Sequence, residues 1–243
     1  MMIPYCGTPP DPSELWRRWN LDPVLIAVLL GSLIVQVRSA ASRQSRALAV
    51  AGWLVAGAAL LSPLCALSVA LFSARIAQHM ILVLVAAPLI AIALPVLPRS
   101  SARLWWSAGI FFIALWFWHM PVPYDTTFRS TWVYWAMHAS LFGSALVLWR
   151  ELLQHSTSQT GASLLAGGLT SMHMGLLGAV LTFAGHPLFY WHLTTAPLWE
   201  FTPLQDQQLG GVLMWVPGIV LFLFAALRSM SRLYATLHDE RTA

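Results

Sequence analysis

Residues 68–94 read SVALFSARIAQHMILVLVAAPLIAIAL, a stretch that is almost entirely apolar. It is longer than the roughly 20 residues with which an α-helix crosses the hydrocarbon core of a membrane. Pro88 lies within it, and packed membrane helices tolerate such a proline as a kink. An ionisable side chain inside a membrane is costly and is a functional candidate by default. The stretch therefore predicts a membrane helix, and His79 makes that helix a candidate for a functional site.

The rest of the chain follows the same pattern. Of its 243 residues, 58% are hydrophobic and only 9% are charged, whereas a soluble domain carries about 25% charged residues. We expect an all-α fold, a polytopic membrane bundle with seven transmembrane helices, in which Pro217 is a second tolerated kink. The seven apolar segments are 23–39, 46–64, 68–94, 102–120, 129–151, 161–185 and 206–229.

The arginines predict how the bundle is oriented. All 13 basic residues are Arg, and with the N-terminus outside, nine of them lie on the inner side and four on the outer side. The excess of positive charge in inner loops then predicts an outer N-terminus and an inner C-terminus. The net charge of +4 thus reports topology and not a nucleic-acid partner. The expected organisation is a periplasmic segment 1–22, a transmembrane domain 23–229 and a cytoplasmic tail 230–243. The apolar core and basic start of a signal peptide are missing from residues 1–20.

Histidines gather in or beside the outer half of the predicted bundle. Several of them are flanked by methionine, and imidazole with thioether is a ligand set that suits copper, especially Cu(I). The six histidines are His79, His119, His138, His173, His186 and His192.

Helix geometry gives the depth of these side chains. At about 1.5 Å per residue, His79, His138 and His173 lie roughly 14–18 Å below the outer surface, and Met214 roughly 12 Å below it. Three histidines from separate helices therefore share one layer. His119 and Asp206 are expected at its outer mouth.

Each of these residues has a plainer interpretation. A single imidazole in a helical bundle can simply bond a neighbouring hydroxyl or carbonyl, and Met80, Met174 and Met214 can simply fill gaps in the packing. His155 and His238 are expected on the inner side, in solvent. Two cysteines, Cys6 and Cys65, are both predicted outside, where a disulfide is chemically possible, but two cysteines in no motif do not establish one. A nucleophile, a base and oxyanion donors are not arranged together, so an enzyme is not expected.

Short motifs spread along the chain resemble one known family. The last segment carries DQQLGG at 206–211 and MWVPG at 214–218, which resemble the last-helix signature of the CtaG-type cytochrome c oxidase assembly factors. The resemblance runs from Trp19 to about Leu227. Further matches are Ser62-Pro63, Gln78-His79-Met80 before Ala87-Pro88-Leu89, Trp118-His119-Met120-Pro121 with Tyr124-Asp125, and His138 with Trp149.

The resemblance implies a factor of the bacterial inner (plasma) membrane that helps to mature a caa-type haem-copper oxidase. Its usual proposed task is copper delivery to the CuB centre of the oxidase. One departure is Met137, where some relatives have an acidic residue before the helix-five histidine; this disfavours a proton relay and is compatible with a softer metal site. The positions that match the family pattern are His79, His119, His138, His173, Asp206 and Met214.

Depth and resemblance together predict a route for copper. Cu(I) from a periplasmic copper donor would arrive near His119, His186 and His192 and pass to a site built from His79, His138 and His173. Met80 or Met214 would be adjustable ligands, and Asp206 would accept a hydrogen bond from an imidazole and so fix its tautomer. The recipient would be the catalytic subunit of the oxidase, within the lipid bilayer.

Three other functions stay open. A metal-free chaperone of the oxidase catalytic subunit would use the histidines only as hydrogen-bonding groups. A haem-binding electron carrier would need two imidazoles facing each other across one macrocycle, for which His79 and His138 are candidates. A transporter would need a polar path across both leaflets, and the inner halves of the helices offer little beyond Ser163 and Thr170.

Overall fold

The structure is a computed structural model that describes residues 3–95, 100–154 and 159–242. This part of the chain consists of helices and connecting loops and contains no strand. The long helices are α1 (Pro23–Ser39), α2 (Arg43–Leu61), α4 (Phe72–Met80), α5 (Ala87–Ala93, joined to α4 by η2, Ile81–Ala86), α6 (Ser101–Trp118), α8 (Thr131–Leu153), α9 (Thr160–Phe183) and α10 (Pro203–Thr242). The short ones are η1 (Leu15–Arg17), α3 (Leu64–Ala70), α7 (Pro121–Thr126), η4 (Tyr190–Leu193) and η5 (Ala196–Trp199).

Helices lie at all seven predicted segments, and the all-α fold is confirmed. Four of them are long and apolar enough to cross a membrane by themselves: Arg43–Leu61, Phe72–Ala93, Thr160–Phe183 and Pro203–Ala235. Pro23–Ser39 and Ala102–Trp118 are shorter apolar helices. The chain is therefore a membrane protein, while the count of seven spans and the orientation stay predictions. The helix that contains the predicted apolar segment 206–229 continues to Thr242, so residues 230–242 extend α10, and their assignment to a cytoplasmic tail stays a prediction.

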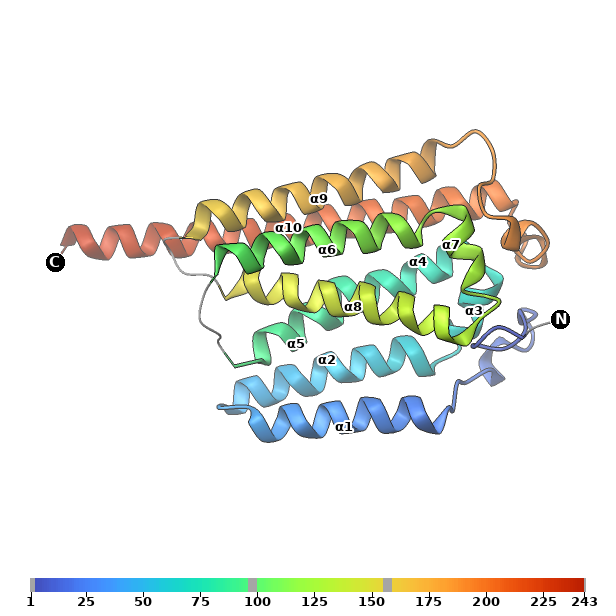
Figure 1. The fold of residues 1–243 in the computed structure, drawn as a ribbon, viewed down its shortest axis with the longest axis horizontal. Coiled ribbons are helices and arrows are strands. Elements are labelled where there is room, and N and C mark those ends of the chain that lie inside the picture. The colour runs from blue at the N-terminus through green and yellow to red at the C-terminus, as the bar shows by residue number, and fades with distance from the viewer. Residues whose placement is uncertain (1–2, 96–99, 155–158, 243) are drawn as a thin grey trace.

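The long helices run side by side, and the chain ends point in opposite directions (Figure 1). One end of the bundle carries the N-terminal segment, α3, α7 and the loop with η4 and η5; we call it the outer end, after the predicted orientation. At the opposite, inner end, α6 begins, α8 ends and α10 projects beyond the other helices.

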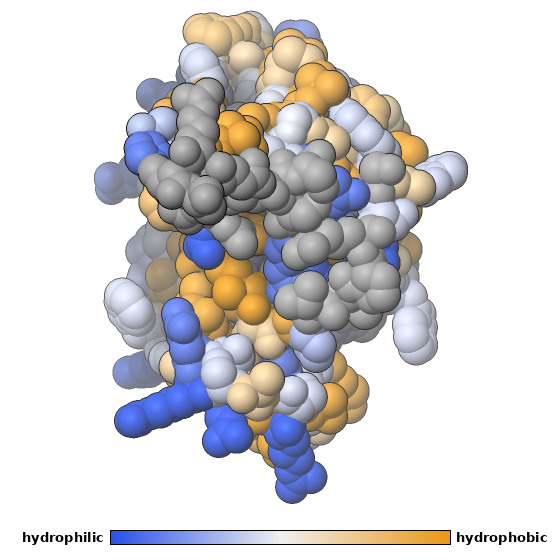
Figure 2. Space-filling view, turned by 90° about the vertical axis from the view of Figure 1, so that its left-hand side faces the viewer, coloured by the Kyte–Doolittle hydropathy of each residue, from blue (hydrophilic) through white to orange (hydrophobic). Residues whose placement is uncertain are grey.

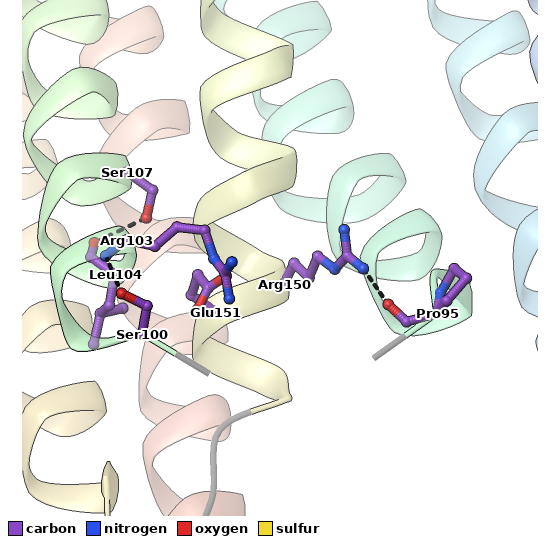
Figure 3. A network of polar contacts seen from close by, with 7 residues as sticks. All are labelled: Pro95, Ser100, Arg103, Leu104, Ser107, Arg150 and Glu151. Atoms are coloured by element: carbon purple, nitrogen blue, oxygen red, sulfur yellow. Dashed lines mark hydrogen bonds and ion pairs between the residues drawn. The ribbon is translucent and has the colours of Figure 1, made fainter. Parts of the chain in front are cut away.

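Arginine side chains hold neighbouring segments together at the inner end. Figure 2 views this end and shows hydrophilic and hydrophobic residues side by side on its surface. Arg103 of α6 forms a salt bridge with Glu151 of α8, and Arg150 donates to the carbonyl oxygen of Pro95 (Figure 3). Ser100 caps α6, because its hydroxyl accepts a hydrogen bond of 3.3 Å from the Arg103 backbone N–H. These contacts tie α5, α6 and α8 together at the inner end.

The segment α4–η2–α5 is the central helix of the fold. It is the most buried of the four candidate spans, with 67% of its apolar window buried. The turn after His79 is π-helical, and Ala87 N–H donates five residues back to the carbonyl of Leu82. The carbonyl of Val83 instead accepts 2.8 Å from the indole N–H of Trp149 on α8. Such π-helical turns are frequent at functional sites. This one accommodates Pro88, which has no backbone N–H to donate.

The helices α9 and α10 approach each other closely only in their outer halves. A Cβ added to Gly211 would lie 2.6 Å from the carbonyl oxygen of Gly178, so neither position has room for a side chain. Gly168, in the inner half of α9, has open space around it. A cavity of about 650 Å³ lies there, lined mostly by apolar side chains of α9 and α10.

Candidate metal centre

Three histidines from three helices meet near the outer end of the bundle. His79 is in the last turn of α4, His119 follows the last residue of α6, and His138 is in the first half of α8. The ring centroid of His79 lies 5.8 Å from that of His119 and 5.3 Å from that of His138. All three side chains are buried, with exposed fractions of 2%, 4% and 4%. We call these residues the histidine cluster.

The hydrogen bonds of the cluster leave nitrogen lone pairs without a partner. His119 Nδ1 donates to the carbonyl of Leu115 at 2.6 Å, and His138 Nδ1 donates to that of Tyr134 at 3.1 Å. A neutral imidazole that donates through Nδ1 carries its lone pair on Nε2. The Nε2 atoms of both residues, and both ring nitrogens of His79, have no hydrogen-bond partner in the structure. Burying an unpaired polar atom costs about 1–3 kcal/mol, so these four nitrogens require an explanation, and a metal ion supplies one.

The spacing of the rings suits pairwise ligation. Two imidazoles bound to one ion through bonds of about 2 Å have centroids roughly 5–6 Å apart. The pairs His79–His119 and His79–His138 meet this spacing. Within residues 3–95, 100–154 and 159–242, however, no three His, Cys, Asp or Glu side chains are arranged so that they could hold one metal ion as they stand. The ring spacing thus fits pairs of imidazoles that would bind one ion at a bent angle, and a third ligand would require a side-chain movement.

Arg75 lies one turn before His79 and is fully buried. Its guanidinium lies over the ring of Phe128, 4.0 Å from the centroid, and within 6 Å of the rings of Tyr124 and Tyr134. It donates to Thr127 Oγ1 at 2.6 Å, and no ion pair with a carboxylate involves it in the described part of the chain. Aromatic faces and neutral acceptors therefore hold a positive charge beside the cluster.

Asp206 fixes the helix that carries both Arg75 and His79. Its carboxylate accepts 2.6 Å from Phe72 N–H, 3.0 Å from Ser73 N–H and 2.5 Å from the Ser73 hydroxyl. A residue of α10 therefore caps the N-terminus of α4, where the helix dipole favours a negative charge. The prediction that Asp206 fixes an imidazole tautomer gains no hydrogen bond from the structure, since both carboxylate oxygens are taken up by α4.

The other predicted ligands are distributed differently. His173 does not join the cluster; its ring packs 4.9 Å from that of Phe112 on α6 and lines a cavity of about 310 Å³. Met80 and Met214 are buried in the main hydrophobic core, which also contains Tyr134. His186 is exposed in the outer loop.

His192, by contrast, is a buried structural residue of the outer loop. Its Nδ1 donates to the carbonyl of Ala70 at 3.1 Å, and its Nε2 accepts 2.8 Å from the Tyr124 hydroxyl. Burial, together with the nearby charge of Arg75, lowers the pKa of His192 to about 3. It remains neutral and joins η4 to α3 and α7. His155, predicted in solvent, lies outside the described residues.

Sequence reasoning missed the residues that surround the cluster. One of them is Arg75, which the charge count places among the four outer arginines with Arg17, Arg18 and Arg129. An arginine four residues before a buried histidine signals a functional position within a span. Tyr134 had no signal, because its importance comes from contacts with α3 and the N-terminal segment. The disulfide was left open and is present: Cys6 and Cys65 are joined, with Cα atoms 5.4 Å apart.

The fold and the cluster define a helical membrane protein with a buried histidine centre near its outer end. The chain matches the model of the cytochrome c oxidase caa3 assembly factor family over residues 28–236, and it belongs to that family. Its role is therefore in oxidase assembly, in association with cytochrome c oxidase. No curated protein and no solved structure matches the chain.

Proposed function

We propose that the protein holds Cu(I) at the histidine cluster and passes it to the CuB centre in the catalytic subunit of a haem-copper oxidase of the bacterial plasma membrane. The observation that carries this proposal is the set of four buried imidazole nitrogens without a hydrogen-bond partner, on three helices. The Nδ1–H groups of His119 and His138 are engaged by carbonyls, and an engaged N–H orients the other nitrogen toward a metal.

Beside Arg75, copper would be bound only transiently at the cluster. A fixed positive charge one turn from His79 disfavours a second positive charge there, because like charges repel strongly where water is excluded. Copper bound by two neutral imidazoles beside Arg75 is held less tightly than at a site with an anionic ligand. Met80 and Met214 remain proposed thioether ligands that could stabilise Cu(I) during its movement. The periplasmic copper donor stays part of the proposal.

Two observations bear on the alternatives. The lack of a ready three-ligand group in the described residues favours a metal-free chaperone as the second candidate. Haem is disfavoured, because two imidazoles on opposite sides of one iron have centroids roughly 6 Å apart with a macrocycle between them. The rings of His79 and His138 are 5.3 Å apart and pack edge to face at 74°.

Copper loading of the full chain tests the proposal. The protein is purified in detergent, loaded with Cu(I) and desalted, and its copper is measured by elemental analysis. We expect His79→Ala/His138→Ala to lose at least ten-fold in bound copper. His173→Ala is the matched control, since its ring nitrogens are also unpaired but lie outside the cluster. Equal copper in the wild type and the double variant would leave the metal-free chaperone as the function.

A further inference from the structure

The disulfide at the outer end contacts Tyr134, a residue that also contacts the histidine cluster. Cys65 is in the first turn of α3 and is fully buried, and Cys6 is half-buried in the N-terminal segment. The hydroxyl of Tyr134 lies 3.3 Å from the sulfur of Cys6 and 3.8 Å from that of Cys65. Both sulfur atoms therefore contact one tyrosine of α8.

The same tyrosine contacts His138. Its ring centroid lies 4.2 Å from that of His138, and its carbonyl accepts the His138 Nδ1 hydrogen bond. Tyr5, next to Cys6, stacks on the Tyr134 ring with centroids 4.9 Å apart. Tyr134 therefore lies between the two sulfur atoms and the imidazole of His138.

Reduced to thiols, this pair has the chemistry of a copper site. Thiolates are soft ligands that select Cu(I), and a two-coordinate ion needs only the two sulfurs. Both atoms belong to segments that their other contacts hold in place: Asn20 Nδ2 lies 3.6 Å from the Cys65 sulfur, and the Tyr5 hydroxyl donates to Asp22 at 2.5 Å. Reduction would therefore leave the two sulfurs near each other.

We propose that Cys6 and Cys65, as a dithiol, are the Cu(I) entry site that loads the histidine cluster, and that the disulfide is its closed form. This inference rests on the proposed function, because it names the point at which the cargo enters. The two thiols lose two protons when they bind Cu(I). The ion then moves past Tyr134 to Nε2 of His138, and the thiolates regain their protons.

Opening the site requires an external protein dithiol as reductant. One of its thiolates attacks the sulfur of Cys6, the accessible partner, and the Cys6–Cys65 bond breaks with Cys65 leaving as the thiolate. The second thiol of the reductant then displaces Cys6 and forms the reductant's own disulfide. Two electrons and two protons pass to the protein, and the external dithiol is oxidised.

The ordinary alternative is a staple that only ties the N-terminal segment to α3. A disulfide closing a long loop stabilises a fold by about 2–4 kcal/mol. In a pure staple the bond alone keeps the two sulfurs together, so they separate on reduction and the reduced protein gains no copper site. The two interpretations differ in the copper capacity of the reduced protein.

Cu(I) stoichiometry in the two redox states is the test. The full chain in detergent, either oxidised or reduced with an immobilised phosphine, is titrated with Cu(I) held by a chromogenic chelator. For the wild type we expect one equivalent in the oxidised form and two in the reduced form, with the near-ultraviolet absorption of a copper thiolate only in the latter. For Cys6→Ser/Cys65→Ser we expect one equivalent under both conditions. For His79→Ala/His138→Ala we expect one equivalent when reduced and none when oxidised.

Failure of this inference and failure of the proposed function give different results. If the reduced and oxidised wild type bind equal copper, the cysteines are a staple and the entry site is refuted, while the cluster stands. If the histidine variant binds as much copper as the wild type in each redox state, the cluster is refuted. Should the serine variant fail to fold, the comparison of the two redox states of the wild type decides the question by itself.

Discussion

The outer and inner ends of the bundle differ in how deeply their polar side chains are buried. At the inner end, Arg103 pairs with Glu151 at the surface, where the Arg103 side chain keeps 33% of its exposure. At the outer end, Arg75 and Asp206 are fully buried, and the histidine cluster lies beside them. Surface pairs are worth about 0–1 kcal/mol, whereas a buried charge is tolerated only with compensating partners. The outer end therefore holds polar groups out of water at a cost in stability, as a functional site does.

The packing of α9 against α10 is also tighter at the outer end than at the inner end. In the outer half, α9 and α10 touch backbone to backbone at Gly178 and Gly211. In the inner half, the same helices are separated by the cavity of about 650 Å³ beside Gly168. The close packing in the outer half is linked to the cluster through α10, because α10 also carries Asp206, which caps the helix of His79.

The largest expected effect comes from removing the buried cap. Asp206→Ala leaves the backbone N–H groups of Phe72 and Ser73 without acceptors at the start of α4. We expect a loss of about 3 kcal/mol in the free energy of unfolding, since each orphaned buried donor costs about 1–3 kcal/mol. Denaturant unfolding of the purified protein, followed by tryptophan fluorescence, measures it.

Asp22→Ala is the matched control for this cap. Asp22 caps α1 through a 2.8 Å hydrogen bond from Val24 N–H in a more exposed position, and the hydrogen bond from Tyr5 lowers the pKa of its carboxyl group. Losing this more exposed cap should cost clearly less stability than losing Asp206. Equal losses at the two positions would mean that burial at the outer end does not matter.

The second effect concerns the closest helix contact. A Cβ on Gly211 meets the Thr182 hydroxyl and the Gly178 carbonyl, and the backbone cannot yield without separating α9 from α10. Gly211→Ala should cost about 2 kcal/mol, as overpacking a tight interface does. Gly168→Ala, with open space around it, should be neutral or stabilise by up to about 1 kcal/mol through helix propensity. Thermal unfolding of both variants measures the difference; a neutral Gly211→Ala would show that the two halves are packed alike.

Local signals explain what could be predicted from the sequence. Hydropathy runs placed the helices, and short motifs placed the family, because both are readable within a few neighbouring residues. Depth estimates put His79 and His138 in one layer, and their rings indeed lie 5.3 Å apart. Depth gives height along a helix but not the direction around the bundle, so His173 was grouped with residues that it does not contact.

Tertiary contacts account for the rest. Hydropathy gives the apolar stretch of α10 but not the end of the helix, because a helix can continue past its apolar stretch. The binding of Asp206 to α4 joins residues 133 or 134 positions apart, and no local pattern encodes it. The position of Tyr134 between the disulfide and His138 depends on three separate segments, which only the folded chain brings together.

The smallest expected effect is a pH dependence at His192, the buried histidine of the outer loop. Its folded-state pKa of about 3 lies below the ordinary value of about 6.5 in the unfolded chain. Above pH 6.5 neither state binds the proton, so the residue contributes no pH dependence there. Between pH 6.5 and 3 the unfolded state binds more protons, so stability falls as the pH falls.

Replacing His192 by glutamine should flatten this dependence. Glutamine can still donate to the Ala70 carbonyl and accept from the Tyr124 hydroxyl, so folding is retained. Between pH 6.5 and 5.5 the wild type should lose about 1 kcal/mol more stability than His192→Gln, measured by denaturant unfolding at each pH. His186→Gln, an exposed histidine of the same loop, is the control and should keep the wild-type slope. If His192→Gln keeps that slope as well, His192 is not held neutral by burial. The contrast between buried polar side chains at the outer end and exposed ones at the inner end then does not extend to the loop that carries His192.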